Sequence, residues 1–293
     1  MNGVLAELGS RLAERLMALL VLPGLLYVGS LLAAASLGGE RLDETGRALR
    51  RAVTPITGAV GSQSAASGLS VALLLTGVLL AAGAGGLAAQ AAGALVDRVW
   101  TGPWPHWAER VARPWTSRRV RAWDAADELR AGAVGAELDA RTAQRNRIGL
   151  ERPCRPTWMA DRMQAADSRI WKEYGLDLTV SWSRLWLVLP DASRAAVQSA
   201  RERLTGTMLL GGWAVLYTLL GALWWPAALV GAVIGLTAWR RARVAVDALA
   251  ELVEAVVDVH GPELAAALGV PVPDQRLVPP IGHVLVERFR KSS

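Results

Sequence analysis

The stretch Gly68–Leu95, with the sequence GLSVALLLTGVLLAAGAGGLAAQAAGAL, contains no charged residue. A helix needs about 20 mainly apolar residues to cross the roughly 30 Å hydrocarbon layer of a bilayer. Because this stretch exceeds that length, it predicts a transmembrane helix over residues 68–96. The composition of the whole chain agrees, since 52% of its residues are hydrophobic.

Three further apolar stretches lie on either side of this one, at Leu16–Leu37, Met208–Leu223 and Trp224–Trp239. The first is long enough to span a bilayer by itself. The other two form one apolar block, interrupted only by Trp224-Trp225-Pro226, which predicts a transmembrane hairpin over residues 208–239. We therefore expect an all-α, polytopic integral membrane protein with four transmembrane helices and a helical cytosolic domain.

The distribution of basic residues predicts the orientation. Arg98 follows the second stretch, and Arg240, Arg241 and Arg243 follow the fourth. Positive charge near the ends of spans favours the cytoplasmic side, so the N-terminal segment 1–15 and the C-terminus are expected inside and the loop 38–67 outside. An excess of Ala, Gly, Arg and Val suggests a bacterial origin, and hence the bacterial cytoplasmic membrane.

The first stretch has an alternative interpretation. Arg11 and Arg15 precede an apolar run that ends in Ala33-Ala34-Ala35, as in a cleaved signal peptide. The run over residues 16–37 is longer than the apolar core of a typical signal peptide, which favours a retained first span.

Small residues recur every four positions within the predicted spans. Gly77 and Gly85 lie on one such ridge, and Gly231 and Gly235 lie on another. This spacing lets helix backbones approach closely, although a composition rich in Gly and Ala would produce part of the pattern. The spans contain no Asp, Glu, Lys, Arg or His, which argues against a proton-coupled carrier but does not argue against a passive pore.

The cytosolic domain, residues 97–207, begins with tryptophan and arginine residues interleaved. Those expected at the membrane interface are Trp100, Trp104, Trp107, Arg110, Arg118 and Arg119. Trp prefers the headgroup layer and Arg is attracted to anionic lipid, so the segment is expected to lie along the inner leaflet. Single-stranded nucleic acid is the alternative ligand, disfavoured because the segment emerges directly from a span. Pro114 is expected to divide the segment, with a new helix after Ser117.

A resemblance to a known family begins at Pro156. Pro156-Thr157 opens a predicted helix that Gly175 ends, and it is followed by Leu176-Asp177, Trp182-Ser183-Arg184-Leu185 and Leu189-Pro190. This order resembles a family of uncharacterised bacterial membrane proteins in which such motifs precede a transmembrane hairpin and a C-terminal helix. The resemblance covers about Pro156–Gly269, with departures at residues 158–161 and Ser183, and it implies architecture without chemistry.

The segment 240–268 is expected to be helical and cytosolic, with a break at Gly261-Pro262. One of its faces carries an acidic stripe, formed by Asp247, Glu251, Glu254 and Asp258. Such a stripe suits a basic partner, either the Arg-rich domain of the same chain or that of a neighbouring copy, whereas a simply solvated face is the alternative. A Pro-rich tail follows at residues 269–293, and its part Gly269–Gly282 is expected to be extended and mobile.

No catalytic motif, cofactor site or metal site is recognisable. His106, His260 and His283 lack the spacing of metal ligands, and Cys154 is the single cysteine. An enzyme is disfavoured, although a site assembled across helices would escape a search by motif. We expect a membrane-anchored scaffold or signalling subunit that engages cytosolic protein partners, as a homo-oligomer or within a larger membrane complex. The alternative is an oligomeric channel gated by the cytosolic domain.

Overall fold

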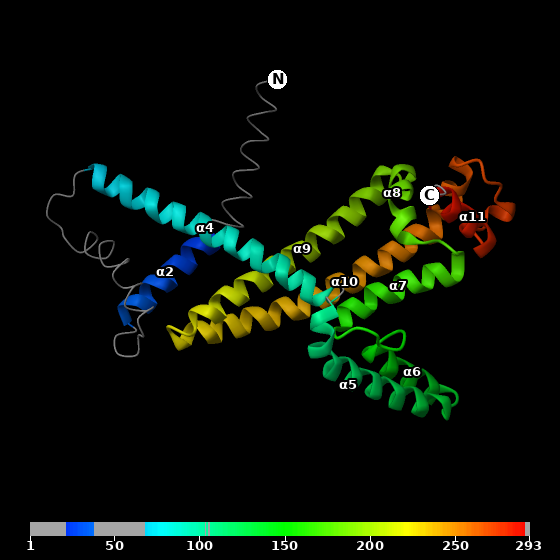
Figure 1. Cartoon of the computed structure of the whole chain (residues 1–293), viewed down its shortest axis with the longest axis horizontal. Coiled ribbons are helices and arrows are strands. Elements are labelled where there is room, and N and C mark those ends of the chain that lie inside the picture. Colours follow the sequence, from blue (N-terminus) through cyan, green and yellow to red (C-terminus); the bar gives the residue numbers. More distant parts are fainter. Residues whose placement is uncertain (1–21, 38–67, 103, 105, 291–293) are drawn as a thin grey trace, which may run out of the picture. The chain divides into compact units, whose positions relative to one another are not determined.

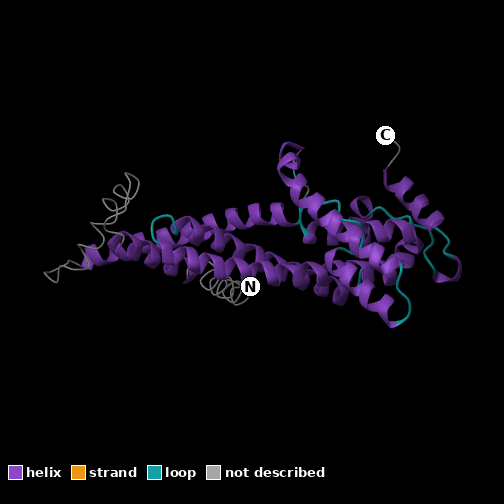
Figure 2. Ribbon diagram, turned by 90° about the horizontal axis from the view of Figure 1, so that it is seen from below, coloured by secondary structure: helices purple, strands orange, loops and turns teal. Residues whose placement is uncertain are grey.

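The computed structural model describes residues 22–37, 68–102, 104 and 106–290. In this part of the chain the ordered elements are helices, and no β-strand occurs (Figure 1, Figure 2). The all-α prediction is therefore confirmed for the described residues. The predicted N-terminal segment 1–15, the start of the first span and the loop 38–67 lie outside them.

The described residues form helices of very different lengths. The α-helices are α2 (Leu22–Leu37), α4 (Gly68–Trp100), α5 (His106–Ala131), α6 (Ala136–Ile148), α7 (Trp158–Tyr174), α8 (Leu178–Val188), α9 (Asp191–Leu220), α10 (Trp225–Ala267) and α11 (Pro279–Arg290). A 3-10 turn, Pro273–Gln275, precedes α11.

The helices divide into two compact units. The apolar unit contains α2, α4 as far as Val96, and the Met208–Trp239 segment, whereas the polar unit contains Asp97–Thr207 and the chain from Arg240 onward. The polar unit thus begins at the residues that follow the apolar stretches of the sequence.

In the apolar unit, one helix among the described residues is long and apolar enough to cross a membrane, the segment Leu75–Trp100 of α4. The apolar part of α2, Leu22–Ala34, is shorter. The apolar segments Met208–Leu220 and Trp225–Trp239 are the C-terminal part of α9 and the N-terminal part of α10, and each is shorter than the ~20 residues of an ordinary span. The structure therefore identifies one candidate span where the sequence predicted four.

Small residues bring the helices of the apolar unit together. A Cβ at Gly93 would lie 3.0 Å from the carbonyl oxygen of Met208, and one at Gly212 would overlap the backbone of Ala89. Aromatic rings fill the space beside this contact. Tyr27 packs edge-on against Tyr217, with ring centroids 5.3 Å apart, and Trp213 lies next to both within the buried cluster.

The polar unit has its own hydrophobic core. Its largest fully buried side chains include Ile170, Leu185, Val257, Leu264 and Leu285, which come from α7, α8, α10 and α11. Helix α7 is preceded by its N-cap Thr157, whose hydroxyl accepts the Ala160 N–H, and followed by Gly175, which has a φ of 65°. The sequence predicted both of these ends.

Three predictions about helix boundaries in the polar unit are wrong. Helix α5 continues through Pro114, and α10 continues through Pro262. A proline inside a helix removes one backbone hydrogen bond, at a cost of about 3 kcal/mol, so packing must outweigh it. Ala112 and Ala126 are buried on either side of Pro114, and Leu264 and Ala265 are buried just after Pro262.

The C-terminal tail is the third correction. Residues 279–282, expected to be extended, form the first turn of helix α11, which continues to Arg290. Leu285, Val286 and Phe289 are buried on one side of it, and the Arg184 guanidinium lies 4.4 Å from the Phe289 ring centroid. An apolar face of this kind stabilises a short helix through its contacts with the core, which the Pro-rich flanking sequence does not indicate.

Candidate functional site

Two parallel helices of the polar unit, α7 and α10, are joined by a ladder of charged and polar side chains. Arg162 donates from Nε to Asp247 Oδ1 at 2.6 Å and from Nη1 to Glu254 Oε1 at 2.8 Å. Arg169 Nη1 donates to Glu254 Oε2 at 2.6 Å, and the Tyr174 hydroxyl donates to Asp258 Oδ1 at 2.8 Å. We call these contacts the α7–α10 ladder.

The centre of the ladder is buried. The side chains of Arg162 and Glu254 are 7% and 10% exposed, whereas that of Arg169 is 54% exposed. Both oxygens of Glu254 are bonded to guanidinium groups, so the buried charges compensate one another. At the end of the ladder, burial and the hydrogen bond to Asp258 raise the pKa of Tyr174 to about 12.

The acidic stripe predicted from the sequence forms one side of this ladder. Asp247, Glu254 and Asp258 bond to side chains of α7, while Glu251 is exposed. The basic groups that meet the stripe belong to the same chain. The sequence analysis missed Arg162 and Arg169, although their separation of seven positions matches that of Asp247 and Glu254 and was the available signal.

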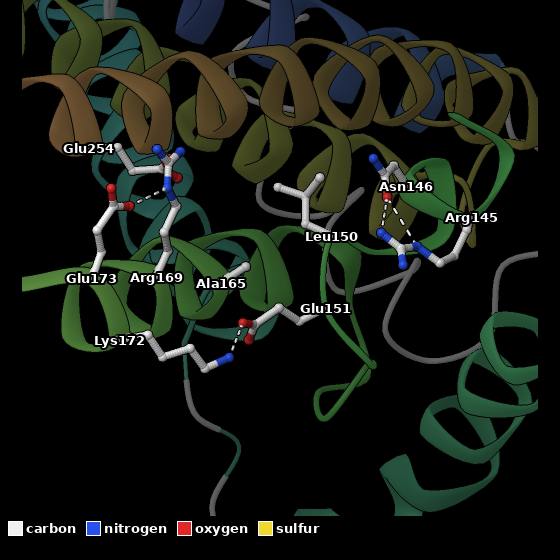
Figure 3. Close-up of a pocket in the computed structure, with 9 residues that line it drawn as sticks. All are labelled: Arg145, Asn146, Leu150, Glu151, Ala165, Arg169, Lys172, Glu173 and Glu254. Carbon is white, nitrogen blue, oxygen red and sulfur yellow. Dashed lines mark hydrogen bonds and ion pairs between the residues drawn. The ribbon is translucent and has the colours of Figure 1, made fainter. Parts of the chain in front are cut away.

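An open groove of about 480 Å³ lies beside the ladder (Figure 3). Its lining consists of Arg145, Asn146, Leu150, Glu151, Ala165, Arg169, Lys172, Glu173 and Glu254. We call it the mixed-charge groove. Lys172 Nζ lies 2.5 Å from Glu151 Oε1, and Arg169 Nε lies 3.4 Å from Glu173 Oε2, so both signs of charge line the rim. Leu150, 43% exposed, adds an apolar contact point.

A second arrangement fixes the loop between α6 and α7. Arg119 of α5 forms an ion pair with Asp161 and donates to the carbonyl oxygens of Ile148 at 2.9 Å and Arg155 at 2.8 Å. Asp161 Oδ1 accepts the backbone N–H groups of Cys154 at 3.0 Å and Arg155 at 2.8 Å. The Arg119–Asp161 pair therefore holds both ends of this loop on α5.

The residues predicted at the membrane interface fall into two groups. Arg110 and Arg118 are exposed on α5, near the exposed Trp115. Arg119 is engaged in the pair just described, and the Trp104 indole N–H donates to the Val99 carbonyl at 3.0 Å.

Two other tryptophans belong to the same prediction. The carbonyl oxygen of Trp100 accepts the Thr157 hydroxyl at 2.6 Å, so this residue ties the end of α4 to the start of α7. The side chain of Trp107 lies outside the described residues.

The four predicted packing glycines differ in their surroundings. A Cβ at Gly231 would lie 2.6 Å from Thr218 Oγ1 and 2.8 Å from Thr218 N, whereas one at Gly235 would make an ordinary contact with Ala214. A Cβ at Gly85 would lie 3.8 Å from the Tyr27 ring, and one at Gly77 would meet open space. Of these four, Gly231 is therefore the position where a side chain is excluded.

No protein-family model, curated protein or solved structure matches this chain. The family resemblance over Pro156–Gly269 therefore stays a prediction. Within the described residues, no group of three or more His, Cys, Asp and Glu side chains is placed to hold a metal ion. The site must accordingly be judged by its own geometry, which consists of a ladder-braced helix pair and the groove beside it.

Proposed function

We propose that this chain is a four-span protein of the bacterial cytoplasmic membrane whose polar unit is a scaffold, or signalling subunit, for a cytosolic protein partner. The observation that carries the proposal is the mixed-charge groove beside the α7–α10 ladder. Because the ladder fixes the helices that line the groove, a partner loses little binding free energy in ordering them. Charges of both signs on the rim suit a protein segment better than a polyanion such as nucleic acid.

Exposed apolar side chains support the membrane part of the proposal. Leu80, Leu87 and Leu95 of α4 are each at least 65% exposed, and Val233 of α10 is 66% exposed. Contact of these side chains with hydrocarbon has no free-energy cost, whereas their exposure to water is unfavourable. The Thr218 hydroxyl fits the same setting, because it donates within its own helix to the Ala214 carbonyl at 2.7 Å.

The exposed arginines of α5 support contact with an anionic leaflet. Four exposed arginines lie along α5: Arg110, Arg113, Arg118 and Arg121. Each basic residue near an anionic surface contributes about 1 kcal/mol to binding.

The four-span topology can be tested by cysteine labelling in a Cys154-free protein. A cysteine at Ser64 should react in intact cells and one at Ser292 only after permeabilisation; reversed accessibility would overturn the topology.

Site-specific photo-crosslinking in native cells tests the scaffold. A photoreactive residue at Leu150, in the groove, should give one discrete product, whereas the same residue at Val134, which is 81% exposed in the α5–α6 turn, should not. Reversing the groove charges with Lys172→Glu and Glu173→Lys should abolish the product. Its mass distinguishes a second copy of this chain from another protein. Equal products from both positions, or none from Leu150, would contradict the proposal.

The channel alternative makes a different prediction. Liposomes containing the purified chain should show no ion flux if the protein is a scaffold. Reproducible conductance that depends on the chain would overturn the scaffold proposal in favour of the pore.

A further inference from the structure

Three side chains of the polar unit form a hydrogen-bonded chain apart from the ladder and the groove. Ser193 Oγ lies 3.2 Å from His260 Nε2, and His260 Nδ1 lies 2.8 Å from Glu263 Oε2. Ser193 is in the first turn of α9, and the other two residues are one helical turn apart on α10. His260 is 9% exposed, while Ser193 is half-buried.

The order of atoms fixes the role of each group. An ionised carboxylate can only accept a hydrogen bond, so a neutral His260 carries its proton on Nδ1 and donates it to Glu263. Nε2 then has a free lone pair and accepts the Ser193 hydroxyl. A serine bonded to an imidazole that a carboxylate orients is the arrangement that activates a serine as a nucleophile.

The backbone beside Ser193 adds donors for developing negative charge. The first hydrogen bond of the α9 ladder runs from the Arg194 N–H to the Pro190 carbonyl, at 3.0 Å. The N–H groups of Asp191, Ala192 and Ser193 therefore have no carbonyl acceptor within α9. Such N–H groups stabilise the oxyanion that forms when a serine attacks a carbonyl carbon.

Glu263 is the most exposed member of the hydrogen-bonded chain. Glu263 lines a hollow of about 690 Å³ between α10 and the loop that follows it. Its other lining residues are Val259, Pro262, Ala266, Gly269, Val270, Pro271 and Val272. Ser193 and His260 are not among these lining residues, so the hollow solvates the Glu263 end of the hydrogen-bonded chain.

The geometry points to an acyl-transfer site in which Ser193 is the nucleophile, His260 the general base and Glu263 a positioning residue, acting on carboxylic esters. Ser193 Oγ bonds to the ester carbonyl carbon as its proton passes to His260 Nε2. The bond from that carbon to the alcohol oxygen then breaks, and His260 returns the proton to the departing alcohol. A water oxygen then attacks the acyl carbon as its proton passes to His260 Nε2. The bond from that carbon to Ser193 Oγ breaks, the acid leaves, and His260 returns the proton to Ser193.

An alkyl fluorophosphonate probe tests the site on the detergent-solubilised full chain. Ser193 Oγ should displace fluoride at phosphorus, and peptide mass spectrometry should locate the label on Ser193. Ser193→Ala should abolish labelling, and the matched control Ser199→Ala, two turns further along α9, should not change it. His260→Gln should slow labelling by about 100-fold or more, the usual contribution of a general base.

Two further measurements separate catalysis from a structural hydrogen-bond network. Glu263→Gln should slow labelling and Glu263→Asp should restore part of the rate, while thermal melting shows that each variant is folded. Hydrolysis of p-nitrophenyl butyrate should follow the same order of variants. A folded wild-type chain that leaves Ser193 unlabelled, or an equal labelling rate in folded His260→Gln, would overturn the proposal.

Discussion

Replacing Arg162 with methionine tests whether the α7–α10 ladder holds the polar unit together. Methionine retains most of the side-chain length but removes the bonds to Asp247 and Glu254. Asp247 is 55% exposed and stays hydrated after the change, so its loss of a partner costs little. Glu254, only 10% exposed, keeps Arg169 as its single partner.

The expected loss follows from this difference in burial. Breaking a buried ion pair costs about 3–5 kcal/mol, and we expect about 3 kcal/mol because Glu254 keeps one partner. For a unit of this size, each kcal/mol shifts the midpoint of thermal unfolding by roughly 2–4 °C, which gives a decrease of roughly 6–12 °C. Arg169→Met, which removes a half-exposed partner, should cost about 1 kcal/mol or less.

The assay is thermal unfolding of the detergent-solubilised chain, followed by circular dichroism. The double variant Arg162→Met with Glu254→Met is the control, because replacing both buried charges with apolar groups should recover most of the lost stability. Equal shifts for Arg162→Met and Arg169→Met would refute the argument from burial. So would a double variant less stable than Arg162→Met alone.

Three further predictions concern other parts of the chain. Arg119→Glu should lower the unfolding midpoint, because it places a second negative charge beside the buried Asp161. Arg118→Glu should leave the midpoint unchanged and increase protease cleavage of α5 in membranes, because Arg118 is exposed. A lower midpoint for Arg118→Glu with an unchanged midpoint for Arg119→Glu would contradict both assignments. Gly231→Leu should destabilise the apolar unit by about 1–3 kcal/mol through overlap with Thr218, and Gly77→Leu should not, so similar midpoints for the two proteins would contradict the packing in the apolar unit. The folded-state pKa of Tyr174, about 12, exceeds the value near 10 of an unfolded tyrosine, so the contribution of the phenol to stability is complete below pH ~10 and is lost as pH rises through ~12. Tyr174→Phe should therefore make the fall of the unfolding midpoint over this pH range shallower. An unchanged slope would show that the phenol is not the cause.

The helical class of the chain and the ends of α7 were predictable because they depend on local features. The length of an uncharged stretch decides α4, and the pair Thr157 and Gly175 decides where α7 begins and ends. Helix α11 was not predictable in this way. Its stability depends on burying Leu285 and Phe289 against helices distant in sequence, which outweighs the prolines around it.

The candidate site shows the same limit. The acidic stripe on α10 was visible because its residues are close in sequence, but the spacing of a stripe does not say whether water or another helix covers it. Arg162 and Glu254 are 92 positions apart, and the fold alone brings them together. Ser193 and His260, 67 positions apart, escaped detection for the same reason.

The position of Cys154 gives the loop between α6 and α7 an intrinsic chemical reporter. Burial, together with the negative charge of Asp161, raises the pKa of the Cys154 thiol, so little of the reactive thiolate exists at neutral pH. Cys154 is exposed, and its Sγ lies 3.5 Å from Asp161 Oδ1. When the Arg119–Asp161 pair opens, the carboxylate moves away from the sulfur, and the thiol should then react faster with maleimide. The alkylation rate of this native cysteine therefore measures how often the loop leaves α5, without any introduced label.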